Sequence, residues 1–223
     1  MTVTPEFRTA IEIGSGICWT LVYLLIIKRG FQDKTYGMPL WALAANISWE
    51  FIFSFILLTH NNVQHVVDIV WCLFDLVIVI QVLRFGRASF KGTPILERYF
   101  YVMAALVLLV SFGAVYTMTL QLESTIPPGR IDGRYAAFSQ NLMMSILFVA
   151  MLINRNNIDG QSIYVGLFKM IGTVLPSILF YLTIPSDVFL NFLYVTIFAF
   201  DLLYVILLFG KMREMKVNPW RRF

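Results

Sequence analysis

Seven stretches of this sequence, each about 20 residues long, are almost entirely apolar. A transmembrane α-helix needs about 20 apolar residues to cross the hydrocarbon core of a bilayer, and in lipid each span must satisfy its own backbone hydrogen bonds. The sequence therefore predicts an all-α integral membrane protein, with seven transmembrane helices in one domain that comprises residues 1–223. The spans are expected at about 9–27, 39–58, 63–83, 98–120, 135–153, 161–183 and 187–209.

The composition favours the same class. Hydrophobic residues make up 59% of the chain and charged residues 13%, and the mean hydropathy is +0.76, which a soluble domain rarely reaches. The net charge of +4 does not indicate nucleic-acid binding, because the basic residues lie in predicted loops and in the C-terminal tail. Cys18 and Cys72 fall inside apolar stretches, where a thiol usually behaves as a small buried hydrophobe.

The basic residues also predict the orientation, since lysine and arginine collect on the cytoplasmic side of a membrane. Thirteen of them fall in the segments 28–38, 84–98 and 154–160 and in the C-terminal tail, whereas three fall on the other side. We therefore expect the N-terminus outside or in the lumen and the C-terminus in the cytoplasm. The segment 121–134 is then the one long outer loop, and its Pro127-Pro128-Gly129 sequence indicates irregular structure; a connector is the simpler interpretation, and a lid is the alternative.

Ionisable residues inside a membrane are costly, so each one is a candidate functional residue. Counted at about 1.5 Å per residue from the span midpoints, Glu50, Asp75 and Asp201 lie within a few ångströms of the bilayer centre and could share one cavity. Glu12 and Asp68 fall nearer the outer surface, where an interfacial position is the simpler interpretation. Lys169 is predicted at about the same depth as Asp201. A Lys169–Asp201 ion pair is therefore as plausible as a catalytic role for Asp201.

Polar and aromatic side chains accompany these acids at helical spacing. Aromatic rings stabilise nearby positive charge, and a carboxyl group in a dry pocket can remain protonated and act as a general acid. On spacing alone, however, ordinary packing explains such rings equally well. The candidate supporting residues are Asn46, Trp49 and Phe53 around Glu50, Trp71 beside Asp75, and Tyr194, Phe198 and Tyr204 around Asp201.

Two neighbouring segments carry a resemblance to a known family. Residues 31–39 read FQDKTYGMP, and residues 46–51 read NISWEF. Together with the small seven-span plan, this block resembles the fungal membrane-bound meroterpenoid and indole-diterpene (paxilline-type) terpene cyclases. The resemblance implies that Glu50 and Asp201 are the catalytic acids, with Asp75 as a weaker candidate.

The resemblance also implies a reaction. Members of the family protonate a terminal epoxide or olefin on a prenyl chain attached to an aromatic, polyketide or indole head group, and the cation closes rings in a cascade. The sequence lacks the D-D-x-x-D cluster that would hold magnesium and diphosphate, so we expect no metal and no organic cofactor. The expected partners are a prenylated, epoxyfarnesyl-type substrate, the lipid bilayer and an upstream epoxidase. The expected location is the endoplasmic reticulum membrane in a eukaryote, or the plasma membrane in a bacterium.

The main alternative from another class is a small proton-coupled transporter, because intramembrane acids often carry protons. A retinal protein is less well supported, since the last span has no lysine for a Schiff base. The sequence does not define the head group, the chain length or the proton donor.

Overall fold

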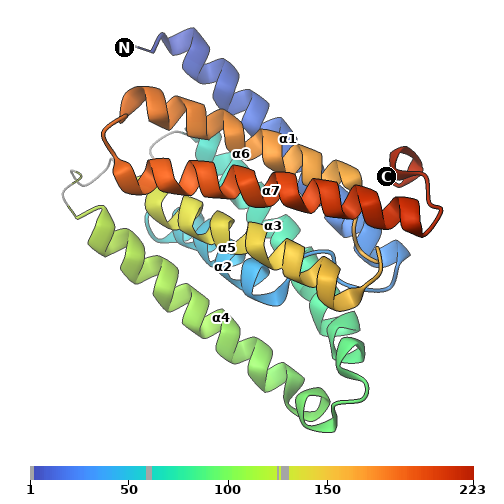
Figure 1. Ribbon diagram of the computed structural model, residues 1–223. Helices are drawn as coiled ribbons and strands as arrows, with labels where there is room; N and C mark the ends of the chain where they lie inside the picture. The colour runs from blue at the N-terminus through green and yellow to red at the C-terminus, as the bar shows by residue number, and fades with distance from the viewer. Residues whose placement is uncertain (1–2, 59–61, 125, 127–130) are drawn as a thin grey trace.

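The computed structural model describes residues 3–58, 62–124, 126 and 131–223, and these residues contain no β-strand. Seven α-helices form a single bundle, and two short 3₁₀ helices lie at one end of it (Figure 1). The helices are α1 (Pro5–Gln32), α2 (Leu40–Phe55), α3 (Asn62–Phe85), η1 (Gly86–Phe90), α4 (Pro94–Leu122), α5 (Arg134–Arg155), α6 (Ile163–Thr183), α7 (Val188–Glu214) and η2 (Pro219–Arg221).

Six of the described helices are long and apolar enough to cross a membrane. The exception is α2, whose 16 residues give about 24 Å, less than the hydrocarbon thickness of about 30 Å. Eleven of its residues are buried, and it packs against α3, α4 and α5. The all-helical architecture is thus confirmed, whereas the crossing of the bilayer by all seven helices stays a prediction.

Local sequence signals explain where several helices begin. Thr4 precedes Pro5 and accepts a hydrogen bond from the Phe7 amide, so that α1 starts with a side-chain cap and a proline in its first turn. Asp187 caps α7 in the same manner, through the Leu190 amide. The outward faces of the helices carry large exposed apolar side chains, which suit contact with lipid.

Helix α1 packs between α3 and α6, and α7 packs between α5 and α6. At Gly30 the approach of α1 to α3 is so close that a side-chain carbon would collide with Gln81, whose amide donates to the Ile27 carbonyl oxygen. This contact fixes the α1–α3 interface near the site described below.

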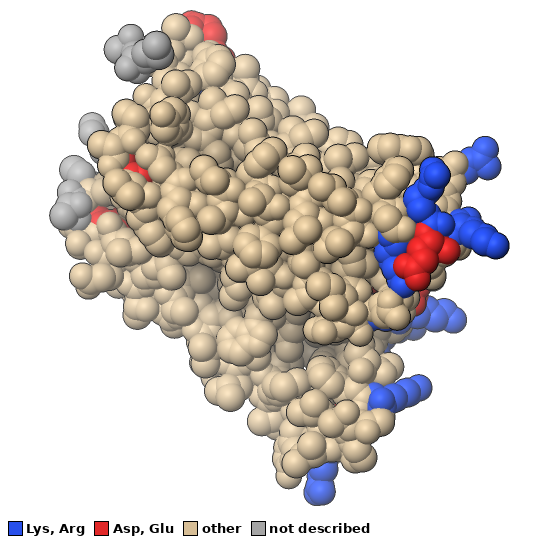
Figure 2. Space-filling view, in the orientation of Figure 1, with Lys and Arg blue, Asp and Glu red and all other residues tan. Residues whose placement is uncertain are grey.

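Charge separates the two ends of the bundle. The visible lysine and arginine side chains gather at the end where the C-terminus lies, and the chain begins at the opposite end (Figures 1 and 2). The loops grouped by the sequence analysis therefore share one end. The assignment of this basic end to the cytoplasm stays a prediction.

Candidate active site

One buried polar cluster joins α1, α2 and α3, and we call Tyr23, Asn46, Glu50 and Asp75 the acidic cluster. Tyr23 donates its hydroxyl hydrogen to Glu50 Oε1 at 3.4 Å. The Asn46 amide donates to the Tyr23 hydroxyl oxygen and, at 2.8 Å, to Asp75 Oδ2. The two carboxyl groups are therefore linked through one amide and one phenol.

Helical spacing explains why Asn46 and Glu50 lie together, but not why Tyr23 joins them. Asn46 and Glu50 are four residues apart on α2 and so lie on the same face, as the sequence analysis assumed. Tyr23 comes from α1, and no spacing rule along α2 or α3 could have identified it. Only the packing of α1 against α3 brings its hydroxyl group to the two acids.

Each acid of the pair keeps one oxygen atom free. Within the described part of the chain, Glu50 Oε2 and Asp75 Oδ1 are buried and have no hydrogen-bond partner, and neither residue forms an ion pair with a described lysine or arginine. An unpaired buried charge is very costly, which favours the neutral form of such groups. A neutral carboxyl group with one oxygen held and the other free is suited to donate a proton.

Two aromatic rings pack on the Tyr23 ring of this cluster. The Tyr23 ring lies 5.9 Å from the Trp71 ring and 5.8 Å from the Phe74 ring, measured between centroids. Trp71 is further fixed by a 3.1 Å hydrogen bond from its indole nitrogen to Thr20 Oγ1. The predicted Trp71–Asp75 pairing thus lies at the site, and the faces of these rings could stabilise a cation there.

The interpretation of Asp68 as an interfacial residue was wrong. Its side chain is fully buried, accepts a 2.7 Å hydrogen bond from Gln64 and lies close enough to Glu50 to interact with it electrostatically. Asp68 and Asp75 are two helical turns apart on the inward face of α3, so that both point into the bundle. Glu12, by contrast, is exposed and pairs with Arg8, as an interfacial residue would.

A second buried cluster, which we call the lysine cluster, contains Asp201. Lys169 Nζ donates to Asp201 Oδ1 at 2.7 Å and to Ser145 Oγ at 2.6 Å, and the Lys169 and Asp201 side chains are only 2% and 3% exposed. The predicted ion pair is therefore present. Asp201 does not join the hydrogen-bonded acidic cluster, although α1 reaches both clusters: Trp19, four residues before Tyr23, lies with its ring 6.0 Å from Lys169 Nζ.

The three aromatic residues predicted around Asp201 lie in different surroundings and do not form one cavity wall. Phe198 is 44% exposed on the outer face of α7, which contradicts its assignment to a cavity; the helical rotation that buries Asp201 turns Phe198 away. Tyr204 is buried but donates to Gln161 Oε1 at 3.1 Å and packs on Phe148. Tyr194 packs edge-on against Phe138, and its hydroxyl group has no described partner.

Trp49 and Phe53 pack beneath the described end of the outer loop. Their rings lie 4.6 Å apart, and the Trp49 indole nitrogen donates to the Gly133 carbonyl oxygen at 3.1 Å. Gly133 has φ +68° and sits so close to both rings that a side-chain carbon would collide with them. Glu123 accepts from the Gly133 amide, and burial raises the pKa of this carboxyl group. The predicted Pro127-Pro128-Gly129 irregularity lies outside the described residues.

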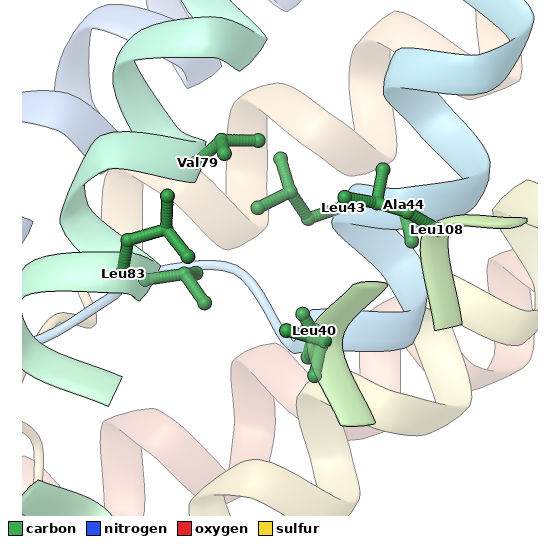
Figure 3. Close-up of a pocket in the computed structure, with 8 residues that line it drawn as sticks. Leu40, Leu43, Ala44, Val79, Leu83 and Leu108 are labelled. Carbon is green, nitrogen blue, oxygen red and sulfur yellow. The ribbon is translucent and has the colours of Figure 1, made fainter. Parts of the chain in front are cut away.

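A small apolar cavity of about 20 Å³ lies between α2, α3 and α4 (Figure 3). Its lining contains only aliphatic side chains, including Leu43, Val79 and Leu108, and neither candidate acid. Within the described residues, no group of three or more His, Cys, Asp and Glu side chains is arranged to hold a metal ion.

Comparison with known proteins gives this geometry its context. A model of the family described as Pyr4-like transmembrane terpene cyclases matches residues 4–213. The Pyr4-family terpene cyclase mfmH of Annulohypoxylon moriforme is 32% identical over 198 residues, which cover 87% of this chain and 80% of the relative. Asnovolin H synthase nvfL of Aspergillus novofumigatus is 28% identical, with 77% and 69% covered, and terpene cyclase pyr4 of Aspergillus fumigatus is 23% identical, with 78% and 73% covered.

No solved structure matches this chain. The matching family and the apolar helices identify a multi-pass integral membrane protein and favour the cyclase interpretation over the transporter. This chain belongs to the Pyr4-like transmembrane terpene cyclases.

Proposed function

We propose that this protein cyclises a prenylated aromatic, polyketide or indole substrate by protonating the terminal epoxide or olefin of its prenyl chain, with Glu50 as the proton donor. The observation that carries the proposal is the state of the Glu50 carboxyl group. It is buried, Tyr23 holds Oε1, and Oε2 is free of any described partner. Family membership supports terpene cyclisation as the reaction.

The chemistry follows from this carboxyl group. Glu50 transfers its proton to the epoxide oxygen, the carbon–oxygen bond opens, and the π electrons of the neighbouring alkene attack the carbon that becomes electron-deficient. Successive alkenes close further rings, and the last cation loses a proton to a base. One proton is given and one returned, so the product is an isomer of the substrate. The hydrogen bond that Tyr23 donates stabilises the carboxylate left on Glu50.

Asp201 is better suited to a different step. A carboxyl group that accepts a 2.7 Å hydrogen bond from a buried ammonium group is stabilised as a carboxylate, which favours acceptance of a proton over donation. We therefore assign the donor role to Glu50. For Asp201 we propose either the acceptance of the final proton or the neutralisation of Lys169.

The membrane environment suits such a reaction. A prenylated substrate partitions into lipid, and a water-poor site lined by Trp71, Phe74 and Tyr23 delays capture of the cation by water. We propose that the reaction needs neither a metal ion nor an organic cofactor, because protonation alone starts it. We also propose an endoplasmic reticulum location and an upstream epoxidase that supplies the epoxide.

The proposal is tested with microsomes that contain the protein. They are supplied with a panel of epoxyfarnesyl phenols, epoxyfarnesyl orsellinates and epoxygeranylgeranyl indoles, and products are analysed by chromatography and mass spectrometry. A cyclic product of unchanged mass that disappears in Glu50→Gln supports the proposal. Wild-type activity in Glu50→Gln at equal protein level would exclude Glu50 as the acid.

A further inference from the structure

A hollow of about 610 Å³ opens at the basic end of the bundle. Its size lies within the range of small-molecule binding sites. Four parts of the chain line it: the loop from α1 to α2, the η1 segment with the end of α3, the C-terminal half of α5, and the loop from α5 to α6. The loop from α1 to α2 belongs to the 31–39 segment on which the family resemblance rests, and the proposed reaction gives it no role.

Hydrogen-bond donors and a flat stacked surface lie at this hollow. The Arg155 guanidinium group lies over the Tyr36 ring, 4.3 Å from its centroid, and Arg155 Nη1 donates to the Tyr36 and Asp159 carbonyl oxygens at 2.9 and 3.0 Å. Arg155 Nη2 is buried and has no described partner. Lys34 and Asn154 are exposed at the same hollow and add an ammonium and an amide donor.

The acidic residues of the lining do not cancel these donors. Asp33 is already neutralised, because Arg29 and Arg222 each donate to it at 2.6 Å. Asp159 is exposed to solvent, where its charge is screened. The hollow therefore favours a ligand rich in hydrogen-bond acceptors, with a ring that can stack on the Arg155–Tyr36 pair.

The hollow continues into apolar surroundings. Leu40, at the start of α2, lines both the hollow and the small cavity shown in Figure 3. That cavity follows α2 past Leu43 and Ala44, between α3 and α4. One of its walls is α4, which buries only six of its 29 residues. A polar hollow that adjoins an apolar cavity, with a helix of largely exposed apolar residues as one wall, fits an amphiphile.

The distance to the proposed acid fits a prenyl chain. Glu50 lies ten positions after Leu40 on α2, which corresponds to about 15 Å along the helix axis. An extended farnesyl chain has a similar length. A head group held in the hollow would therefore present the chain end at the depth of Glu50.

We propose that this hollow binds the head group of the substrate, an aromatic ring that carries hydroxyl, carbonyl or carboxylate oxygens, while the prenyl chain runs past Leu40 along α2 toward Glu50. This assignment rests on the proposed function. It adds a specificity site at the basic end, remote from the acids, and makes chain length a condition for reaction.

Photolabelling tests the site without any need for turnover. The probe is an epoxyfarnesyl phenol with an aryl azide on its ring, added to full-length protein in microsomes, and the adducts are mapped by peptide mass spectrometry. We expect adducts within residues 33–40, 85–90 and 147–159, and their loss in Ala88→Trp, which fills the exposed mouth of the hollow. Adducts that lie elsewhere, or that persist in Ala88→Trp, overturn the assignment.

Kinetics separates the site from the chemistry. In Ala88→Trp we expect KM to rise by about tenfold or more for the epoxyfarnesyl phenol and to stay unchanged for an epoxyfarnesyl chain without the ring. The matched control is Ile95→Trp, an exposed position near the same end that does not line the hollow. An unchanged KM for the phenol refutes the assignment. If the wild type cyclises neither compound, the proposed function fails, and photolabelling alone decides whether the hollow binds the ring.

Discussion

The Lys169–Asp201 ion pair provides the sharpest test of how the buried charges are used. Asp201→Asn keeps the shape of the side chain and an oxygen that can accept from Lys169, but it removes the negative charge that balances the buried Lys169 ammonium group. Removing one partner of a buried pair costs about 3–5 kcal/mol, or about two to four orders of magnitude in the folding equilibrium. Typical total stabilities are about 5–15 kcal/mol, so the loss should be large.

The assay measures abundance in membranes, melting temperature in detergent and cyclisation in parallel. We expect Asp201→Asn to be scarce and to melt early, and Asp201→Asn combined with Lys169→Met to recover both properties, because no charge is then left unpaired. Glu12→Gln is the matched control: it breaks the exposed Arg8–Glu12 pair and should change neither property. If Asp201→Asn accumulates and melts like the wild type, the argument from buried charge is wrong.

The double variant also decides the chemical role of Asp201. A stable double variant that produces no cyclic product assigns Asp201 to the reaction. Recovery of cyclisation together with abundance shows instead that Asp201 only neutralises Lys169, and the catalytic role implied by the family resemblance then fails for this residue.

Further predictions concern the acid, its hydrogen-bond donor, the metal requirement and the orientation. Glu50→Gln should accumulate normally and lose about 10² to 10⁴ in rate, measured as product formed per amount of protein. Tyr23→Phe should lower kcat with little change in KM, because it removes the hydrogen bond to Glu50 Oε1. The control Tyr164→Phe loses a hydrogen bond to the Trp220 carbonyl oxygen and should leave kcat unchanged. An equal loss of kcat in both variants would contradict the positioning role of Tyr23. Cyclisation should survive EDTA, and its loss with recovery on adding magnesium would refute metal independence. A tag after Phe223 should be accessible to protease only from the cytoplasmic side, and glycosylation of an acceptor site there would reverse the orientation.

Hydropathy located the helices well because it is a local property of the chain. The expected span 161–183 became α6, Ile163–Thr183, and the span 135–153 became α5, Arg134–Arg155. Helix α2 alone falls well short of its expected span, because it ends at Phe55 instead of residue 58, whereas α1 and α7 run past theirs to Gln32 and Glu214. A central helix covered by its neighbours need not match the lipid thickness, and hydropathy alone does not reveal which helix is central.

Sequence reasoning missed two residues of the candidate site for related reasons. Tyr23 lies in an apolar stretch, and a tyrosine in a membrane span is not costly in free energy as an ionised residue is. Nothing in the sequence therefore marked its hydroxyl group as the link between Glu50 and Asn46. Asp68 was assigned to the membrane interface by its distance from the span midpoint, although it lies on the same face of α3 as Asp75. The helical spacing of α3 is enough to group Asp68 with Asp75, whereas Tyr23 required the packing of α1.

The sequence by itself determined the class of protein, the approximate helix positions, the shared end of the basic loops and the identity of the intramembrane charges, because each depends on composition along a single segment. Only the tertiary structure decided how those charges are grouped. Depth along a helix follows from counting residues, but the rotation of each helix and its choice of neighbours follow from side-chain packing across the bundle. For that reason Glu50 and Asp201, predicted at similar depths, belong to different clusters, one linked through Tyr23 and Asn46 and the other held by Lys169.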